Sequence, residues 1–170
     1  KSSDMQRFVA KCIEVIRRNS SQMVTVGSAY ACGNNYQQNR NYWHENEFDA
    51  LGFHFEEVHL DFYSFHYFEW MDDDKDVFQL EGTHWNMNKP ILIAESASRT
   101  TEKPMLKSAK EQLKSAFDNK YAGVLFWSYN AGDEYSQWGD FKNDVDEFAN
   151  ENATATEIEI NCDTKTVIQD

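Results

Sequence analysis

The chain has 170 residues, of which 41% are hydrophobic and 15% aromatic, and its 16 basic and 29 acidic side chains give a net charge of −13. This size and apolar content fit one globular domain, and the low Gly and Pro counts (7 and 2) argue against a disordered or collagen-like chain. The longest apolar runs are far shorter than the roughly 20 residues that cross a bilayer. The negative charge disfavours nucleic acids and anionic membranes, so we expect neutral or cationic partners.

The cysteine count is odd. Cys12, Cys32 and Cys162 show neither CxxC nor Cys/His zinc spacing, so at most one internal disulfide forms. Asn19 and Asn152 each begin an Asn-X-Ser/Thr glycosylation triplet, which favours a secretory-pathway or extracellular location. The first seven residues are polar and lack the apolar region of a signal peptide, so we expect a trimmed precursor or a piece of something longer.

Helices and strands alternate along the predicted chain. Ser3 and Gln6 have capping-box spacing, which predicts the start of an amphipathic helix. Its predicted apolar stripe is Met5, Phe8, Val9, Cys12, Ile13 and Ile16. Strands are predicted at 23–27, 58–65, 89–94 and 122–128, a helix at 104–117 with Pro104 in its first turn, and a last helix at 140–150. The stretch 31–46 has no apolar period. Within it, residues 34–43 are predicted to be a surface loop, with a sugar-groove lining as the alternative.

The spacing of the predicted strands indicates four βα units. The strands start roughly 31 to 35 residues apart, which is about the length of a βα unit with its loops. A complete (β/α)8 barrel typically needs about 250 residues and rarely fewer than 200. A small doubly wound sheet could use four strands, but no glycine-rich phosphate turn follows any of them. Composition and spacing alone therefore predict an α/β domain.

Chemically active side chains stand where the predicted strands end. The second strand runs into His66 and Tyr67, the third ends at Glu95, and the fourth ends at Trp127. In barrel enzymes the catalytic groups stand at the carboxyl ends of the strands. A carboxylate there can attack an anomeric carbon, and an indole face can stack on a pyranose ring. The strand ends therefore favour sugar chemistry.

These residues resemble motifs of the family-five glycoside hydrolases, the endo-β-mannanases and cellulases. The run Lys89-Pro-Ile-Leu-Ile-Ala-Glu95 resembles their strand seven, which ends in the nucleophilic glutamate. The other similar segments are 61–66 (strand six), 123–127 (strand eight with its sugar-stacking Trp), 23–27 (strand five) and 52–55, a segment before strand six. The resemblance covers roughly residues 5–150. It implies that Glu95 is the nucleophile and that His66, Tyr67 and Trp127 bind the sugar.

The resemblance also shows what this chain lacks. The family's general acid/base comes from an Asn-Glu pair on strand four, upstream of the segment present here. A retaining mechanism needs two carboxyl groups about 5 Å apart, so this chain supplies only the attacking one. The family's strand six has a tyrosine two residues after the histidine, but Phe68 stands at that position. Tyr67 or Tyr63 is the candidate to replace its hydroxyl.

A metal site is not predicted. His44-Glu45-Asn46-Glu47 lacks the second histidine of a zincin helix, and the five histidines show no ligand spacing. The acidic run 72–74 lacks the glycine and glutamate of a calcium-binding EF-hand loop. No cofactor is predicted.

Together these features predict that residues 1–150 form the carboxy-terminal half of a (β/α)8 barrel, strands five to eight. A tail, 151–170, could add an edge strand at 156–160. The open edges and uncovered core face of a half barrel require a covering partner, most simply the missing amino-terminal half, to which the odd cysteine could cross-link. The expected function is hydrolysis of a β-1,4-linked glycan such as mannan or glucan. The alternative is an inactive glycosidase-like domain with a structural or carbohydrate-binding role in an extracellular assembly.

Overall fold

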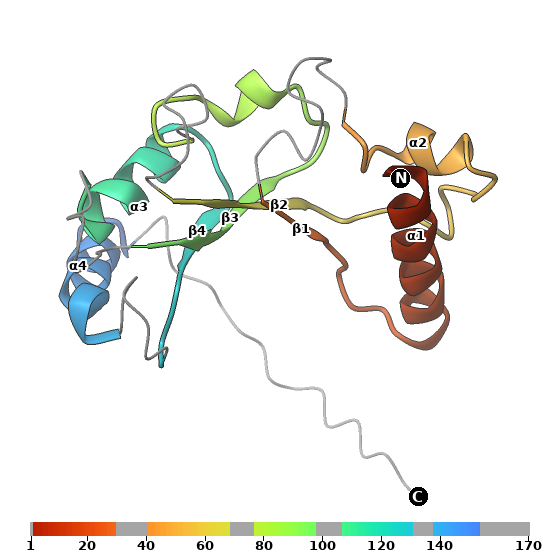
Figure 1. Ribbon diagram of the computed structural model, residues 1–170. Helices are drawn as coiled ribbons and strands as arrows, with labels where there is room; N and C mark the ends of the chain where they lie inside the picture. The colour runs from red at the N-terminus through yellow and green to blue at the C-terminus, as the bar shows by residue number, and fades with distance from the viewer. Residues whose placement is uncertain (1, 30–40, 69–76, 98–106, 131–137, 154–170) are drawn as a thin grey trace, which may run out of the picture.

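The computed structural model describes residues 2–29, 41–68, 77–97, 107–130 and 138–153. Helices and strands alternate along the chain (Figure 1). The helices are α1 (Ser2–Asn19), α2 (Glu45–Asp49), the 3-10 helix η3 (Gly82–Trp85), α3 (Ala109–Asp118) and α4 (Trp138–Glu151). The strands are β1 (Gly27–Ser28), β2 (Tyr63–Tyr67), β3 (Ile91–Ser96) and β4 (Gly123–Phe126). None of the described helices is long and apolar enough to span a membrane.

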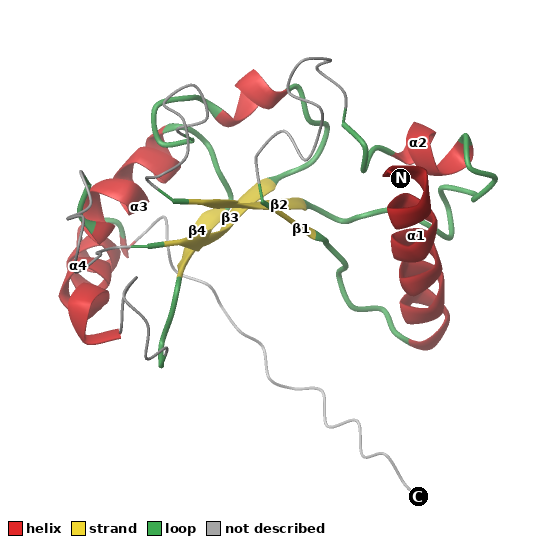
Figure 2. Ribbon diagram, viewed as in Figure 1, coloured by secondary structure: helices red, strands yellow, loops and turns green. Residues whose placement is uncertain are grey.

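The four strands form one parallel sheet in the order β1-β2-β3-β4. The described helices lie in an arc from α1 and α2 at one end of the sheet, past η3, to α3 and α4 at the other (Figure 2). A doubly wound sheet reverses its strand order and carries helices on both faces, whereas neighbouring barrel strands follow chain order. The chain is therefore a parallel-strand half of a (β/α)8 barrel, as the sequence predicted.

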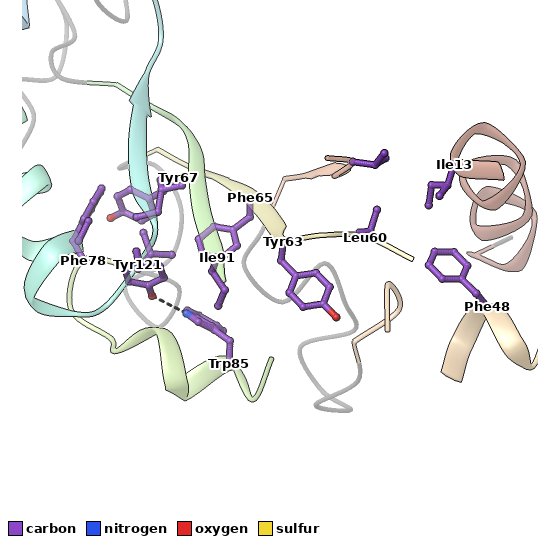
Figure 3. Close-up of a cluster of buried hydrophobic side chains, with 14 of the residues drawn as sticks. Ile13, Phe48, Leu60, Tyr63, Phe65, Tyr67, Phe78, Trp85, Ile91 and Tyr121 are labelled. Carbon is purple, nitrogen blue, oxygen red and sulfur yellow. Dashed lines mark hydrogen bonds between the residues drawn. The ribbon is translucent and has the colours of Figure 1, made fainter. Parts of the chain in front are cut away.

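The main core lies between the sheet and the surrounding helices and loops (Figure 3). Alternate residues of β2, Tyr63, Phe65 and Tyr67, are buried on this side. The ring of Phe65 meets Trp85 and Tyr121 edge to face, with centroids 6.1 and 6.0 Å away. The indole N–H of Trp85 donates to the Tyr121 hydroxyl (2.7 Å), so the polar edges of these rings are satisfied inside the core.

The observed strands begin later than predicted, and before β1 a side chain binds the backbone. Val24 and Leu60 are buried, as apolar runs should be, but they precede β1 and β2. The Asp61 carboxylate accepts the Val24 N–H (2.6 Å) and a guanidinium N–H of Arg17 (2.7 Å). This contact ties α1 to both segments and occupies a backbone donor near β1.

The predicted start of α3 was wrong. Residues Lys107 and Ser108 are described and not helical, and the helix begins at Ala109. A complete capping box sets this boundary, because the Ser108 hydroxyl accepts the Glu111 N–H and the Glu111 carboxylate accepts the Ser108 N–H. Pro104 lies outside the described residues.

The predicted apolar stripe of α1 is only partly buried. Gln6, Ala10 and Ile13 are the buried residues of this helix, whereas Met5 and Phe8 are exposed. The side-chain amide of Gln6 donates to the backbone carbonyl of residue 42 (2.8 Å) rather than closing a capping box with residue 3. The exposed apolar residues of α1 are Met5, Phe8, Val15 and Ile16.

The short helix α2 was not predicted from the sequence. α2 begins after His44, whose imidazole accepts the Asn46 N–H and caps the helix. Its Phe48 is fully buried in the core, and Glu45 forms an ion pair with Lys89 (2.5 Å). Lys89 also donates to the Leu60 carbonyl. Lys89, the lysine of the strand-seven motif, therefore links α2 to the amino end of β3.

The Glu45–Lys89 pair should make stability depend on pH. Burial raises the pKa of Glu45, but hydrogen bonds from Lys89, its own backbone N–H and Asn88, with the lysine's charge, outweigh burial and hold it below the usual value of 4.5. The folded pKa is thus below the unfolded pKa, so the stabilisation is complete above about 4.5 and is lost as pH falls through the folded pKa. Glu45→Gln should cost about 1–3 kcal/mol of unfolding free energy at pH 7 and less in acid.

Urea unfolding at pH 7 and pH 3 measures this difference. The matched control is Asp118→Asn, which removes an exposed i,i+4 pair with Lys114 (2.8 Å) and should cost at most about 0.5 kcal/mol. Equal losses in the two variants at pH 7 would contradict the role assigned to the Glu45 pair.

Candidate active site

The carboxyl ends of β2 and β3 bring His66 and Glu95 together. The two residues are register partners on neighbouring strands, and the imidazole Nδ1 lies 3.1 Å from Glu95 Oε2. Their side chains are 28% and 29% exposed, respectively, so each is held by its surroundings and still open to solvent. A protonated Nδ1 donates to the carboxylate, fixing its orientation and leaving the second carboxylate oxygen available for chemistry.

A β-bulge in β3 determines which way Glu95 faces. Phe65 is paired with Ile93, but the next residue of β2, His66, is paired with Glu95. Ala94 is therefore an extra residue in β3, and the register against β4 shifts over the same stretch. Successive side chains point to opposite faces of a strand, and one extra residue reverses that alternation. Without the bulge Glu95 would follow Ile93 onto the helix side of the sheet, away from His66.

Gly27, the first residue of β1, makes room for the imidazole of His66. A Cβ atom at this position would lie 3.2 Å from His66 Nε2 and 3.8 Å from Cε1. The ring of His66 is therefore enclosed between the backbone of β1 and the Glu95 carboxylate. This role of Gly27 was not predicted, although a glycine at the end of a predicted strand often marks such a close approach.

Gly27→Ala should displace His66. The new methyl group would require the ring to move by a few tenths of an ångström, and we expect shifted His66 ring resonances and a weaker contact with Glu95. Overpacking of this kind costs about 1–3 kcal/mol of stability. Gly139→Ala is the matched control, because nothing lies within 4 Å of its added Cβ. His66 resonances unchanged in Gly27→Ala, by heteronuclear NMR, would refute the close packing.

Trp127 directly follows β4 and stands next to the pair along the row of strand ends. Its backbone N–H donates to the carbonyl of Ser96 (2.9 Å), the residue after Glu95. Its side chain is 38% exposed, so part of the indole is accessible. The peptide bond between Trp127 and Ser128 is cis. Three of the predicted site residues are thus on adjacent strand ends.

Tyr67 is not part of this group. It lies on the same side of β2 as Tyr63 and Phe65, buried in the core, and its ring meets Phe78 edge to face with centroids 5.3 Å apart. The alternation of side chains along β2 places it opposite to His66. This position removes Tyr67 from the candidate sugar-binding residues. Tyr63 is also no substitute for the absent hydroxyl, because its own hydroxyl donates to Asn88 (2.9 Å), and burial raises its pKa to about 12.

The remaining sequence predictions fall at the surface or outside the described residues. Within the described part of the chain, no group of three His, Cys, Asp or Glu side chains could hold a metal. Cys12 is a free, exposed thiol, whereas Cys32 and Cys162 lie outside the described residues. The side-chain amides of Asn19 and Asn152 donate to carbonyls one helical turn earlier, at 2.7 and 2.9 Å. Glycosylation of either remains a prediction, and the proposed edge strand at 156–160 is likewise not described.

Comparison with solved structures finds the same fold in parts of several β-mannanases. No protein-family model matches the sequence, and no curated protein does. The solved structures that resemble the chain include the β-1,4-mannanase of the sea hare Aplysia kurodai, with a TM-score of 0.73 and 20% identity over 94% of this chain. They also include the endo-1,4-β-mannanase of Eisenia fetida, with a TM-score of 0.71 and 22% identity over 87% of this chain.

The extent of these matches agrees with a partial barrel. The chain spans 44% of the Aplysia enzyme and 41% of the Eisenia enzyme. The β-mannanase of the blue mussel Mytilus edulis gives the same result, with a TM-score of 0.71, 19% identity and 41% of its length covered. The chain therefore has the fold of somewhat less than half of a β-mannanase barrel.

Proposed function

We propose that this chain is the carboxy-terminal half of a retaining endo-β-1,4-glycanase of the mannanase or cellulase type. The observation that carries the proposal is the Glu95–His66 pair, in contact at the carboxyl ends of two neighbouring strands of a half barrel. Trp127 at the next strand end offers a partly open indole for stacking on a sugar. The fold shared with β-mannanases supports a β-1,4-linked mannan or glucan as the substrate class.

In this proposal Glu95 attacks the anomeric carbon of the bound sugar. The glycosidic C–O bond breaks while an acid protonates the leaving oxygen, which forms a glycosyl ester on Glu95. The same acid then acts as base and takes a proton from water, which hydrolyses the ester with net retention. His66 orients the attacking carboxylate, and Trp127 forms the floor of the sugar subsite.

The acid/base comes from the other half of the barrel. Retaining hydrolysis places its two carboxyl groups about 5–5.5 Å apart, so the second group must enter from a strand that faces Glu95 across the barrel mouth. The missing length supports this arrangement, because the chain corresponds to only 41–44% of the similar mannanases. This chain alone is therefore expected to be inactive.

The amino-terminal half barrel is the proposed covering partner. Val124 and Phe126 of β4 pack toward the core and toward Phe141 of α4, so the intervening Leu125 faces the opposite side of the sheet, where it is 55% exposed. In a complete barrel such inward side chains fill the interior. The exposed apolar residues of α1 offer a second surface for the adjoining helix of that half. Covering both surfaces would bury the apolar area that the described chain leaves open.

An extracellular setting completes the proposal. The two glycosylation triplets at Asn19 and Asn152 are consistent with passage through the secretory pathway. The catalytic half is assigned to residues 1–150, and the tail, 151–170, is assigned no catalytic part.

One observation favours a second candidate, an inactive domain that binds glycan or supports an assembly. Phe68, which packs partly against the core, stands where the resembling enzymes have the tyrosine that bonds the nucleophile. Without a tyrosine hydroxyl at position 68, the contact that β2 offers to the Glu95 carboxylate is the one from His66. The two candidates differ in one property, the reactivity of Glu95.

Mechanism-based labelling distinguishes the candidates. The chain in complex with its amino-terminal half barrel is treated with a 2-fluoro β-mannoside carrying a good leaving group, and peptides are analysed by mass spectrometry. We expect a glycosyl ester on Glu95 and none on Glu57, an exposed carboxylate that precedes the amino end of β2. Absence of label on Glu95 in the complex would reject the enzyme and favour the binding domain.

A further inference from the structure

On the helix side of the sheet, buried hydrogen bonds from Gln112 of α3 hold the strand end that carries Glu95. We call the hydrogen bonds of Gln112 with Ser96 and Ala97 the bridge. Ser96 and Gln112 of α3 are both 0% exposed, and the Ser96 hydroxyl donates to the Gln112 side-chain carbonyl (2.6 Å). The amide nitrogen of Gln112 donates to the backbone carbonyls of Ala97 (2.9 Å) and Lys107 (3.2 Å). One glutamine thus binds two successive residues that directly follow Glu95.

This bridge is unusual for its position in the helix. The other buried residues of α3 are Ala109 and Ala116, which present a small apolar face to the sheet. A buried amide is tolerated only when its hydrogen bonds are made, and here the donor and acceptor of Gln112 are both used. An apolar side chain of similar length would fill the same space without a polar requirement.

The bridge favours the side-chain directions that the bulge produces in the last residues of β3. Ala94 is the extra residue of β3, and beyond it Glu95 faces His66 while Ser96 faces α3. In an unbulged strand Ser96 would face the barrel interior and Glu95 would face the helices. The hydrogen bond from Ser96 to Gln112 is made only in the bulged arrangement. It therefore favours the register in which Glu95 opens onto the barrel interior.

We propose that Gln112 is a positioning residue for Glu95, which it holds on the interior face by binding Ser96 and the Ala97 carbonyl. This inference rests on the proposed function for one point, the role of Glu95 as nucleophile. Gln112 itself touches no substrate, because it is fully buried behind the sheet. A displacement of about 1 Å in a reacting group can lower a rate about 100-fold, so a fastening of this kind acts on kcat rather than on substrate binding.

The test uses the chain in complex with its amino-terminal half barrel. Gln112→Met removes the bridge and keeps the side-chain length, and Ser96→Ala removes only the hydroxyl. Ser108→Ala is the control, because it weakens the start of the same helix by removing its capping hydroxyl and leaves the bridge intact. The readouts are kcat and KM on a soluble mannan, and the nuclear Overhauser contact between the Glu95 side chain and the His66 ring.

We expect Gln112→Met to lower kcat by about 10- to 100-fold with KM unchanged, and to lose the Glu95–His66 contact. Ser96→Ala should show the same effects more weakly, and the double variant should be no worse than Gln112→Met, because both changes remove one bridge. Ser108→Ala should retain kcat and the contact. Loss of kcat in Ser108→Ala equal to that in Gln112→Met would instead attribute the effect to the stability of α3 and overturn the inference.

The contact readout separates this inference from the proposed function. If the parent complex hydrolyses nothing while Gln112→Met and Ser96→Ala still lose the Glu95–His66 contact, the proposed function fails and the positioning role stands. If the parent is active and both variants retain the contact and kcat, the positioning role fails and the function stands. Ser96→Ala carries the test alone should Gln112→Met fail to fold.

Discussion

Glu95→Gln should lower the hydrolysis of β-1,4-mannan by the assembled barrel about 10⁴-fold or more, the scale of loss that follows removal of an enzymatic nucleophile. The amide keeps the size and hydrogen-bonding reach of the side chain toward His66, which lies 3.1 Å from the carboxylate. It cannot form a glycosyl ester, so the loss falls on kcat. Reducing-sugar release measures overall hydrolysis, and stopped-flow assays with an aryl glycoside measure formation of the glycosyl ester.

A smaller variant makes the same prediction sharper. Glu95→Ala leaves space beside His66, and a small anion such as azide should enter it, attack the anomeric carbon of an activated glycoside and restore turnover with inverted stereochemistry. The control is Glu57→Gln, an exposed carboxylate away from the strand ends, which should retain full activity. An assembled barrel whose Glu95→Gln variant still hydrolyses mannan at the parent rate would remove Glu95 from the mechanism.

Parts of the fold could be predicted because their signals are local. Strands buried in a parallel sheet are continuous apolar runs, and 91–94 and 123–126 were found from that signal. The strand starts were misplaced because they depend on long-range contacts, such as the Asp61 carboxylate that accepts the Val24 N–H from 37 residues away. The capping box at Ser108 is local and was overlooked in favour of Pro104, so that boundary was available from the sequence.

The face of α1 could not be predicted from periodicity. Met5 and Phe8 recur with helical spacing and are exposed, whereas Gln6 is buried by a bond to a backbone carbonyl 36 residues away. Periodicity identifies an apolar face but cannot say which segment will cover it. The apolar face of α1 that the described residues leave open is consistent with the proposed amino-terminal half barrel as its cover.

The candidate site was predicted as a set of strand ends but not as a geometry. Glu95 and His66 were found because each follows a buried strand, and the structure brings them into contact. The contact requires the extra residue Ala94, which has no signal in an unbroken aliphatic run. Tyr67 is the opposite case, since counting by two from the buried Phe65 would have placed it in the core.

Leu125→Glu should weaken association with the amino-terminal half barrel about 1,000-fold. Leu125 lies between two β4 residues that face the helices, so it points to the interior of the completed barrel, where its side chain would lose all contact with water. An unpaired carboxylate buried there costs on the order of 4 kcal/mol, which corresponds to about three orders of magnitude in Kd. In the isolated chain the same change is mild, because the side chain is 55% exposed.

Phe55→Glu is the matched control for this prediction. Phe55 is 54% exposed and lies in the turn region after α2, so it has nearly the same starting exposure and receives the same charge, but it is not on the sheet. Titration calorimetry with the amino-terminal half should give a parent-like Kd for Phe55→Glu and a greatly raised one for Leu125→Glu. Parent-like binding by Leu125→Glu would mean that the partner does not cover the inner face of the sheet. A buried, unpaired charge on that face would weaken binding measurably.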